Sequence, residues 1–241
     1  MTLTKDLYIL SQLTESQLPQ DCGKMYAATH GALFDDPDNP TPDKLNPARL
    51  LENIRLWNLK RKTPSILVID IELDPMTVPA EQYGDLIAIA QADIPNWIVV
   101  PYVIPQVGAP YWWAVLNRAQ TKHVYVGFQR NNNHPNGIGN TQPTSILALI
   151  EWVNAVVLVP SENIIAGIEY WYTEDGKLHW REPSSLVADV GELVRNNTKL
   201  AIWNPQPRTP LMDAYRKSVR DTIRTIKAAT LARNTLDQAV L

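Results

Sequence analysis

The segment 65–74 places two carboxylates two residues apart at the end of an apolar run. Its letters are SILVIDIELD, so Asp70 and Glu72 follow the apolar positions 66–69. Successive strand residues point to opposite faces, and Asp70 and Glu72 therefore share one face at the carboxyl end of the strand. Two neighbouring acids in a partly dry site cannot both ionise freely, so one keeps its proton near neutral pH. The pair predicts general acid catalysis.

Strand-like and helix-like patterns alternate around this acid pair, as in a parallel α/β fold. We expect strands over residues 7–13, 25–33, 66–72, 97–104, 123–128, 164–171 and 200–203. We expect helices over 46–62, 79–92, 111–120, 144–159, 184–195 and 210–236, and a hairpin turn at 175–176. The end of 144–159 is equally compatible with a strand.

About seven or eight strands, with no internal linker and no repeat of fixed period, favour one domain over residues 1–241. The predicted fold class is α/β, a single (β/α)8-like (TIM) barrel with irregularities, in preference to a doubly wound sheet. A barrel brings the carboxyl ends of all its strands to one rim, which is where such folds place their chemistry.

Other strand ends add groups to this predicted rim. Glu169 lies in the expected strand 164–171 and is the candidate catalytic partner of Glu72 across the mouth of the barrel. Aromatic rings and amides at strand ends suit a sugar, whose C–H faces stack on rings while its hydroxyl groups bond to polar side chains. The candidate substrate-binding residues are Tyr102, Gln106, Gln129, Trp171, Trp203 and Asn204.

The residues Val68-Ile-Asp-Ile-Glu72 resemble the Asp-x-Glu strand motif of barrel glycosidases, namely the chitinase-like hydrolases and the barrel-type lysozymes of phages. The resemblance implies that Glu72 donates a proton and that Asp70 orients the substrate or stabilises the developing charge. It implies hydrolysis of a polysaccharide or cell-wall glycan, completed by a second carboxylate or by the substrate's own N-acetyl group. The longer Asp-x-x-Asp-x-Asp-x-Glu pattern of chitinases and the Asp-rich opening strand of barrel lysozymes are missing from this sequence.

Composition and motifs argue against several other classes. The net charge of -3 at pH 7 predicts no basic surface for nucleic acid. The single Cys22 and four scattered histidines predict no zinc-type cluster, and we expect neither a metal nor a cofactor. The sequence lacks the glycine-rich P-loop motif and the Gly-x-Ser-x-Gly nucleophile elbow, which argues against a P-loop NTPase and an α/β-hydrolase. Without a signal peptide or a membrane-length apolar window, we expect no membrane partner and a cytoplasmic or virion-associated location.

The alternative function is that of a non-catalytic barrel, which binds carbohydrate or serves as a structural module in an assembly such as a phage virion or tail. An ordinary strand that leaves the core for a turn at Asp74-Pro75 carries the same acids. The C-terminal helix, basic over 215–227, is the expected surface for a homo-oligomer or an assembly partner. The adjacent Trp112 and Trp113 are expected to split between the core and the surface of one helix.

Overall fold

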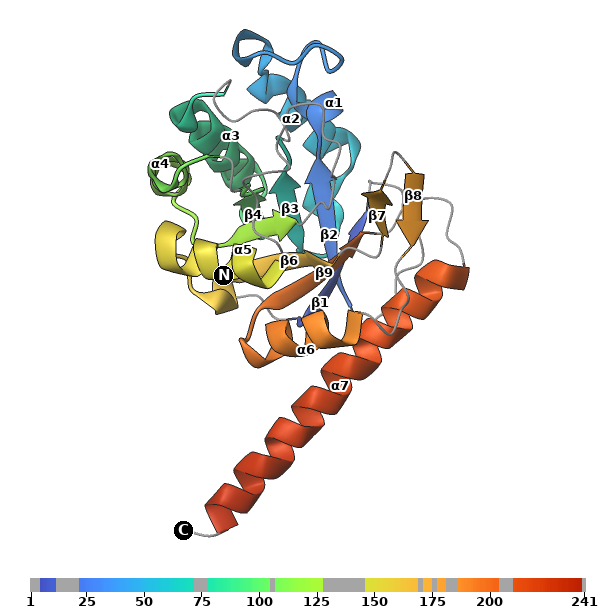
Figure 1. Ribbon diagram of the computed structural model, residues 1–241. Helices are drawn as coiled ribbons and strands as arrows, with labels where there is room; N and C mark the ends of the chain where they lie inside the picture. The colour runs from blue at the N-terminus through green and yellow to red at the C-terminus, as the bar shows by residue number, and fades with distance from the viewer. Residues whose placement is uncertain are drawn as a thin grey trace.

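Seven parallel strands curl into a nearly closed barrel in the described part of the chain (Figure 1). The computed structural model describes residues 5–11, 22–71, 78–104, 107–127, 146–168, 171–174, 177–180, 186–203 and 210–239. The barrel strands are β1 (Leu7–Ser11), β2 (Gly23–Ala28), β3 (Ile66–Ile69), β4 (Ile98–Pro101), β5 (Val124–Gly127), β6 (Ile164–Ile168) and β9 (Lys199–Trp203).

The order of these strands in the sheet is β4-β3-β2-β1-β9-β6-β5, and every paired neighbour runs parallel. A parallel bridge between Tyr102 and Tyr125 joins the two edge strands β4 and β5. The strands thus follow one another around the barrel in chain order. The predicted α/β barrel is confirmed, with the lower of the two expected strand counts in the described residues.

Helices surround the strands on the outside of the barrel (Figure 1). They are α1 (His30–Leu33), α2 (Pro47–Leu56), α3 (Ala80–Asp93), α4 (Ala109–Ala119), α5 (Ile146–Trp152), α6 (Leu186–Arg195) and α7 (Pro210–Ala239). Asn46 caps α2 as its position before Pro47 predicts, because its side-chain oxygen accepts the N–H groups of Ala48 and Arg49 at 3.0 and 3.2 Å. None of the described helices is long and apolar enough to cross a membrane.

Three local predictions have clear outcomes. The strand expected over 25–33 ends at Ala28, and Leu33 lies in the short helix α1 instead. The ambiguous end of 144–159 is a π-helical turn over Val153–Val157. The predicted hairpin is confirmed as the antiparallel pair β7 (Trp171–Glu174) and β8 (Lys177–Trp180), inserted between β6 and α6. A short apolar run fits both the helical period of 3.6 residues and the strand period of two residues. Packing against neighbouring elements therefore decides whether it forms a helix or a strand.

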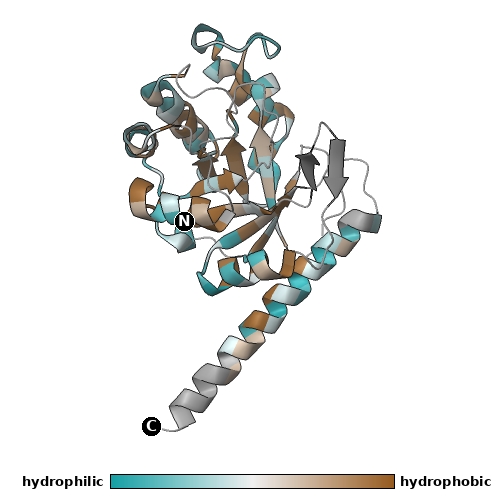
Figure 2. Cartoon of the chain, viewed as in Figure 1, coloured by the Kyte–Doolittle hydropathy of each residue, from teal (hydrophilic) through white to brown (hydrophobic). Residues whose placement is uncertain are grey.

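Two apolar layers hold the barrel together, and Figure 2 shows hydrophobic residues concentrated on the strands and the helix faces beside them. The outer layer lies between strands and helices. The inner layer fills the barrel, and three inward tyrosines there lie where a Cβ on a facing glycine would clash, with contacts of 2.4 to 2.7 Å. The three pairs are Tyr8 over Gly23, Tyr102 over Gly127 and Tyr125 over Gly167. Large side chains facing small ones therefore fill the barrel without a pore.

The phenol of Tyr83 in α3 reinforces the β3–β4 pairing from outside the barrel. Its hydroxyl donates to the Ile69 carbonyl at 2.6 Å and accepts the Tyr102 N–H at 3.0 Å. The same Tyr102 N–H also donates directly to Ile69 O at 3.2 Å. The Tyr83 hydroxyl therefore adds a second hydrogen-bonded link between the two strands. This contact lies next to the β4–β5 edge, where the Val103 N–H donates to Tyr125 O at 2.8 Å.

Replacing Tyr83 with phenylalanine is expected to lower the free energy of unfolding by about 1–3 kcal/mol, because two buried polar groups lose a partner. Urea unfolding followed by circular dichroism measures this change. Tyr111→Phe is the matched control: its half-buried hydroxyl donates to one carbonyl, that of Val78 at 2.8 Å, and a smaller loss is expected. Equal losses in the two variants would contradict a special role for Tyr83.

His123 should make the fold sensitive to acid. It is 5% exposed just before β5, beside a cavity of about 520 Å³. Burial, with the nearby Lys122 charge, lowers the pKa of His123 from 6.5 to about 4. Between these two pKa values, His123 binds a proton in the unfolded chain but stays neutral in the folded chain. The free energy of unfolding is therefore expected to fall as the pH drops from 6.5 to about 4. Unfolding at several pH values checks this, and His123→Gln should flatten the slope in that window.

Candidate active site

Asp70 is the one predicted catalytic residue that falls within the described part of the chain. It directly follows β3, and its N–H donates to Ala28 O at 2.9 Å, which extends the β2–β3 pairing by one residue. Val68, two residues earlier, belongs to the apolar layer inside the barrel. Alternation along the strand therefore directs Asp70 to the barrel mouth. The residue is half-buried and its Oδ1 atom is buried.

The Asp70 carboxylate is electrostatically coupled to the buried Tyr83 on the outer side of β3. Burial raises the pKa of Tyr83 well above 10.0, and the negative charge of Asp70 raises that pKa further. Tyr83 therefore stays protonated over the whole range in which enzymes work, and its hydroxyl can keep donating to Ile69 O. The end of β3, and with it the backbone that carries Asp70, is fixed by this neutral phenol.

Tyr102 lies inside the barrel just below the mouth. It is 6% exposed, its hydroxyl donates to Gly127 O at 3.4 Å, and its ring centroid lies 5.2 Å from that of Tyr125. The predicted substrate-binding residue thus forms the floor of the mouth, between β4 and β5.

Two aromatic side chains of α4 hold the described ends of the segments that follow β3 and β4. The Tyr111 hydroxyl donates to Val78 O at 2.8 Å, and the Trp112 indole N–H donates to Ile104 O at 3.1 Å. Their rings meet edge to face with centroids 5.1 Å apart. Trp112 is 1% exposed and Trp113 is 42% exposed, which confirms the predicted split between core and surface.

Sequence reasoning did not assign positioning roles to Tyr83 and Tyr111. The only local signal for them is a tyrosine within a helix next to a predicted rim strand, which is too common to single them out. Their roles depend on which carbonyl each hydroxyl meets, and those carbonyls are more than ten residues away in the chain: Ile69 for Tyr83 and Val78 for Tyr111.

Several predicted residues lie outside the described part of the chain. These are Glu72, Gln106, Gln129, Glu169 and Asn204. For two more the backbone alone is described: Trp171 opens β7 opposite Trp180, and Trp203 ends β9 opposite Leu10 of β1. Trp203 thus belongs to a barrel strand at its carboxyl end, whereas Trp171 belongs to the hairpin. In the described ranges, no three histidine, cysteine or acidic side chains gather where they could hold a metal ion.

The described strands form a parallel α/β barrel, and one acid, Asp70, lies at the carboxyl end of β3. No protein-family model matches the chain, and no curated protein matches its sequence. A solved structure of similar fold is a GH18 chitinase from Pseudoalteromonas aurantia, with a TM-score of 0.52 and 11% sequence identity. The similarity covers 82% of this chain and 76% of the chitinase chain. At this identity the likeness concerns the fold.

Proposed function

We propose that this protein is a glycoside hydrolase that acts on a polysaccharide or cell-wall glycan, with Glu72 as the general acid. The observation that supports it is the position of Asp70, an acid with a buried Oδ1 at the carboxyl end of a barrel strand. Barrel enzymes keep their catalytic groups at this end. Glu72 follows two residues later, the spacing at which neighbouring acids in a strand share a face.

In the proposed reaction, the Glu72 carboxyl group protonates the oxygen of the glycosidic bond as that bond breaks. Asp70 remains ionised, and its negative charge keeps the Glu72 proton in place and stabilises the positive charge that develops on the sugar ring. Tyr83 and the β2–β3 pairing hold the Asp70 backbone, which limits the freedom that its carboxylate must lose on binding.

The second half of the reaction needs a base or a nucleophile, and two candidates remain. Glu169 is the protein candidate, and the N-acetyl group of the substrate is the other. If Glu169 acts, a carboxyl separation of about 5 Å implies a covalent intermediate with retention, and about 6.5–9.5 Å leaves room for an attacking water and inversion.

The first test is reducing-sugar release by the purified protein from chitin, peptidoglycan, and plant and bacterial polysaccharides. The chitinase of similar fold makes chitin the first substrate to try. Release from one member of this set supports the proposal and identifies the substrate class. No release from any of them would contradict it.

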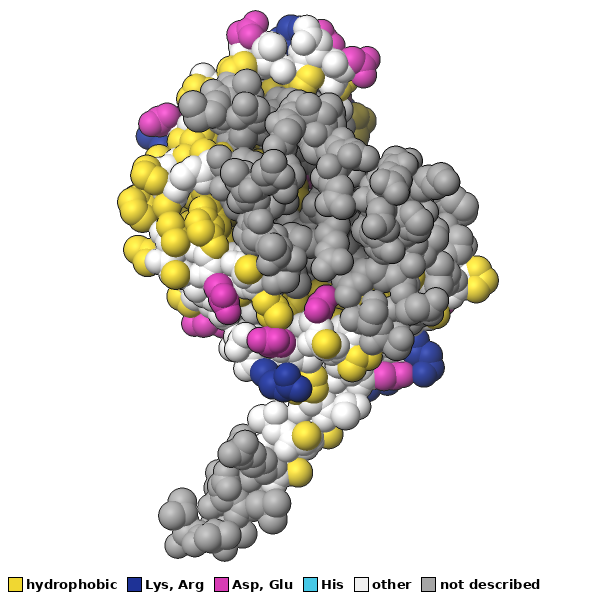
Figure 3. All heavy atoms as spheres, viewed as in Figure 1, with side chains coloured by type: hydrophobic (Ala, Val, Ile, Leu, Met, Phe, Trp, Pro, Cys, Tyr) yellow, Lys and Arg dark blue, Asp and Glu magenta, His cyan; other side chains and the backbone are white. Residues whose placement is uncertain are grey.

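A non-catalytic assembly role is the second candidate, and two surface features favour it. The far part of α7 projects beyond the barrel (Figure 1), and residues 227–230 on it are exposed. Hydrophobic side chains also gather on the face over α4 and α5 (Figure 3). Trp113 of α4 is 42% exposed, and Leu158, which follows the π-helical turn Val153–Val157, is 68% exposed. Exposed apolar groups of this size are typical of surfaces that contact another protein. Analytical ultracentrifugation tests self-association through them.

A further inference from the structure

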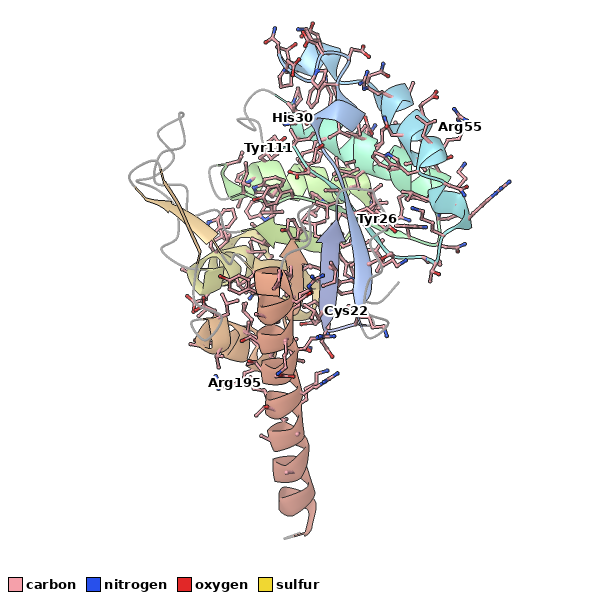
Figure 4. All side chains as sticks on the ribbon, turned by 90° about the vertical axis from the view of Figure 1, so that its right-hand side faces the viewer. Cys22, Tyr26, His30, Arg55, Tyr111 and Arg195 are labelled. Atoms are coloured by element: carbon pink, nitrogen blue, oxygen red, sulfur yellow. The ribbon has the colours of Figure 1, made fainter. Side chains whose placement is uncertain are left out.

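A second concave surface lies at the opposite end of the barrel from Asp70, where the amino end of β1 meets α7. It is a pocket of about 470 Å³, which we call the foot pocket. Figure 4 shows Cys22 at the foot of the two N-terminal strands, beside α7. The residues that line the foot pocket are Lys5, Asp6, Leu7, Cys22, Arg220, Ile223, Arg224 and Lys227.

Positive charge dominates this pocket. Four of its lining residues are cations and one, Asp6, is an acid. Asp6 accepts a hydrogen bond from Lys227 and lies 3.5 Å from the Nζ of a further cation, Lys199. On α7, beside the pocket, Asp221 is shared between Lys217 at 2.7 Å and Arg224 at 4.0 Å. Among the described lining residues, four cations therefore face one carboxylate.

The two elements that carry these cations are fixed by packing. Three side chains of α7 are buried, with exposed fractions of 0% to 7%: Tyr215, Val219 and Ile223. They anchor the helix against the body of the protein. Arg220 and Arg224 are one helical turn apart and therefore lie on the same side of α7. Just before β1, the Asp6 carbonyl accepts the Leu200 N–H at 2.9 Å. The backbone that carries Arg220, Arg224 and Lys227 is thus fixed by the packing of α7.

We infer that the foot pocket binds the phosphate groups of a small phosphorylated molecule. Arginine guanidinium groups favour phosphate oxygens, which they bind through paired N–H donors, and lysines add point charges. The volume falls in the range of pockets that enclose small ligands. The site shares no residue with the candidate active site at the other end of the barrel, and it does not depend on the proposed hydrolase activity.

Isothermal titration of the whole protein with inorganic pyrophosphate, at low and at physiological salt, tests this inference. We expect saturable binding of one pyrophosphate per chain that weakens as salt rises. The double variant Arg220→Gln/Arg224→Gln is expected to bind at least about tenfold more weakly, since two charge-assisted contacts are lost. The matched control is Arg55→Gln/Lys60→Gln, which removes two exposed cations far from the pocket and should bind like the wild type.

Three results would overturn the inference: no saturable binding, equal affinity in the two double variants, or binding only to vesicles that contain phosphatidic acid. The last would assign the cations to a membrane surface instead of a soluble ligand. If the arginine variant does not fold, Lys5→Gln/Lys227→Gln replaces it, because both lysines are exposed. The same loss of affinity is expected from that variant, and its absence counts against the site equally.

Discussion

Glu72→Gln is expected to lower glycan hydrolysis by about 10²–10⁴-fold while the protein stays folded. Glutamine keeps the shape of the side chain but carries no proton that it can give to the leaving oxygen, and general acid catalysis is worth a factor of this size. Reducing-sugar release from the substrate found in the panel measures the loss. A thermal unfolding curve of the variant checks the fold, and a change within about 0.5 kcal/mol is expected for the proposed role of Glu72, which makes no contribution to the core.

The matched control for this experiment is Glu52→Gln. Glu52 is an exposed acid on α2, in a surface ion pair with Arg55 at 2.7 Å, and its replacement should leave both activity and stability unchanged. Unchanged activity in Glu72→Gln would contradict the assignment of the general acid. Unfolding of that variant alone would identify Glu72 as a structural acid and favour the assembly role.

Gly167→Ala is expected to destabilise the protein by about 1–3 kcal/mol, because the interior of the barrel has no room for one more methyl group. A Cβ at position 167 would lie 2.5 Å from the Tyr125 hydroxyl oxygen and 3.3 Å from the backbone of Gly127. The methyl group would therefore press on β5 beside the Tyr102–Tyr125 bridge that closes the barrel. Denaturant unfolding measures the loss.

Gly31→Ala is the control for this variant, since nothing lies within 4 Å of a Cβ at that position on α1. Its stability should equal or slightly exceed that of the wild type. The double variant Gly167→Ala/Tyr125→Phe removes the hydroxyl from the clash and should recover part of the lost free energy, which a double-mutant cycle quantifies. A cost of Gly167→Ala that is independent of Tyr125 would show that the two residues do not share the space.

Local sequence patterns determined much of the fold. The apolar run at 66–69 predicts a strand buried on both faces, and β3 is buried along its whole length. Asn46 before Pro47 predicts the start of α2, and its side chain makes the capping bonds. The alternation of strands and helices predicts the barrel itself. The β3 strand and the α2 cap each depend on residues close together in the chain, and the alternation is a series of such local patterns, so the sequence alone contains this information.

The position of Asp70 was likewise accessible from the sequence, because an acid that follows a buried apolar run must lie where the strand leaves the core. The effect of the Asp70 charge on the pKa of Tyr83 could not be predicted from the sequence. The two residues are 13 positions apart and come close only when α3 packs on β3. The floor made by Tyr102 over Gly127 depends on how the edge strands β4 and β5 meet.

Tertiary structure also decided what lies at the foot of the barrel. The cations of 215–227 look in the sequence like the wet face of a terminal helix, and Arg224 and Lys227 are indeed exposed. Only the packing of α7 brings them to Lys5 and Asp6 at the other end of the chain. Helical and strand periods report which face of an element is apolar, whereas the charge of a pocket depends on which elements meet. That is decided by the burial of side chains far apart in the chain.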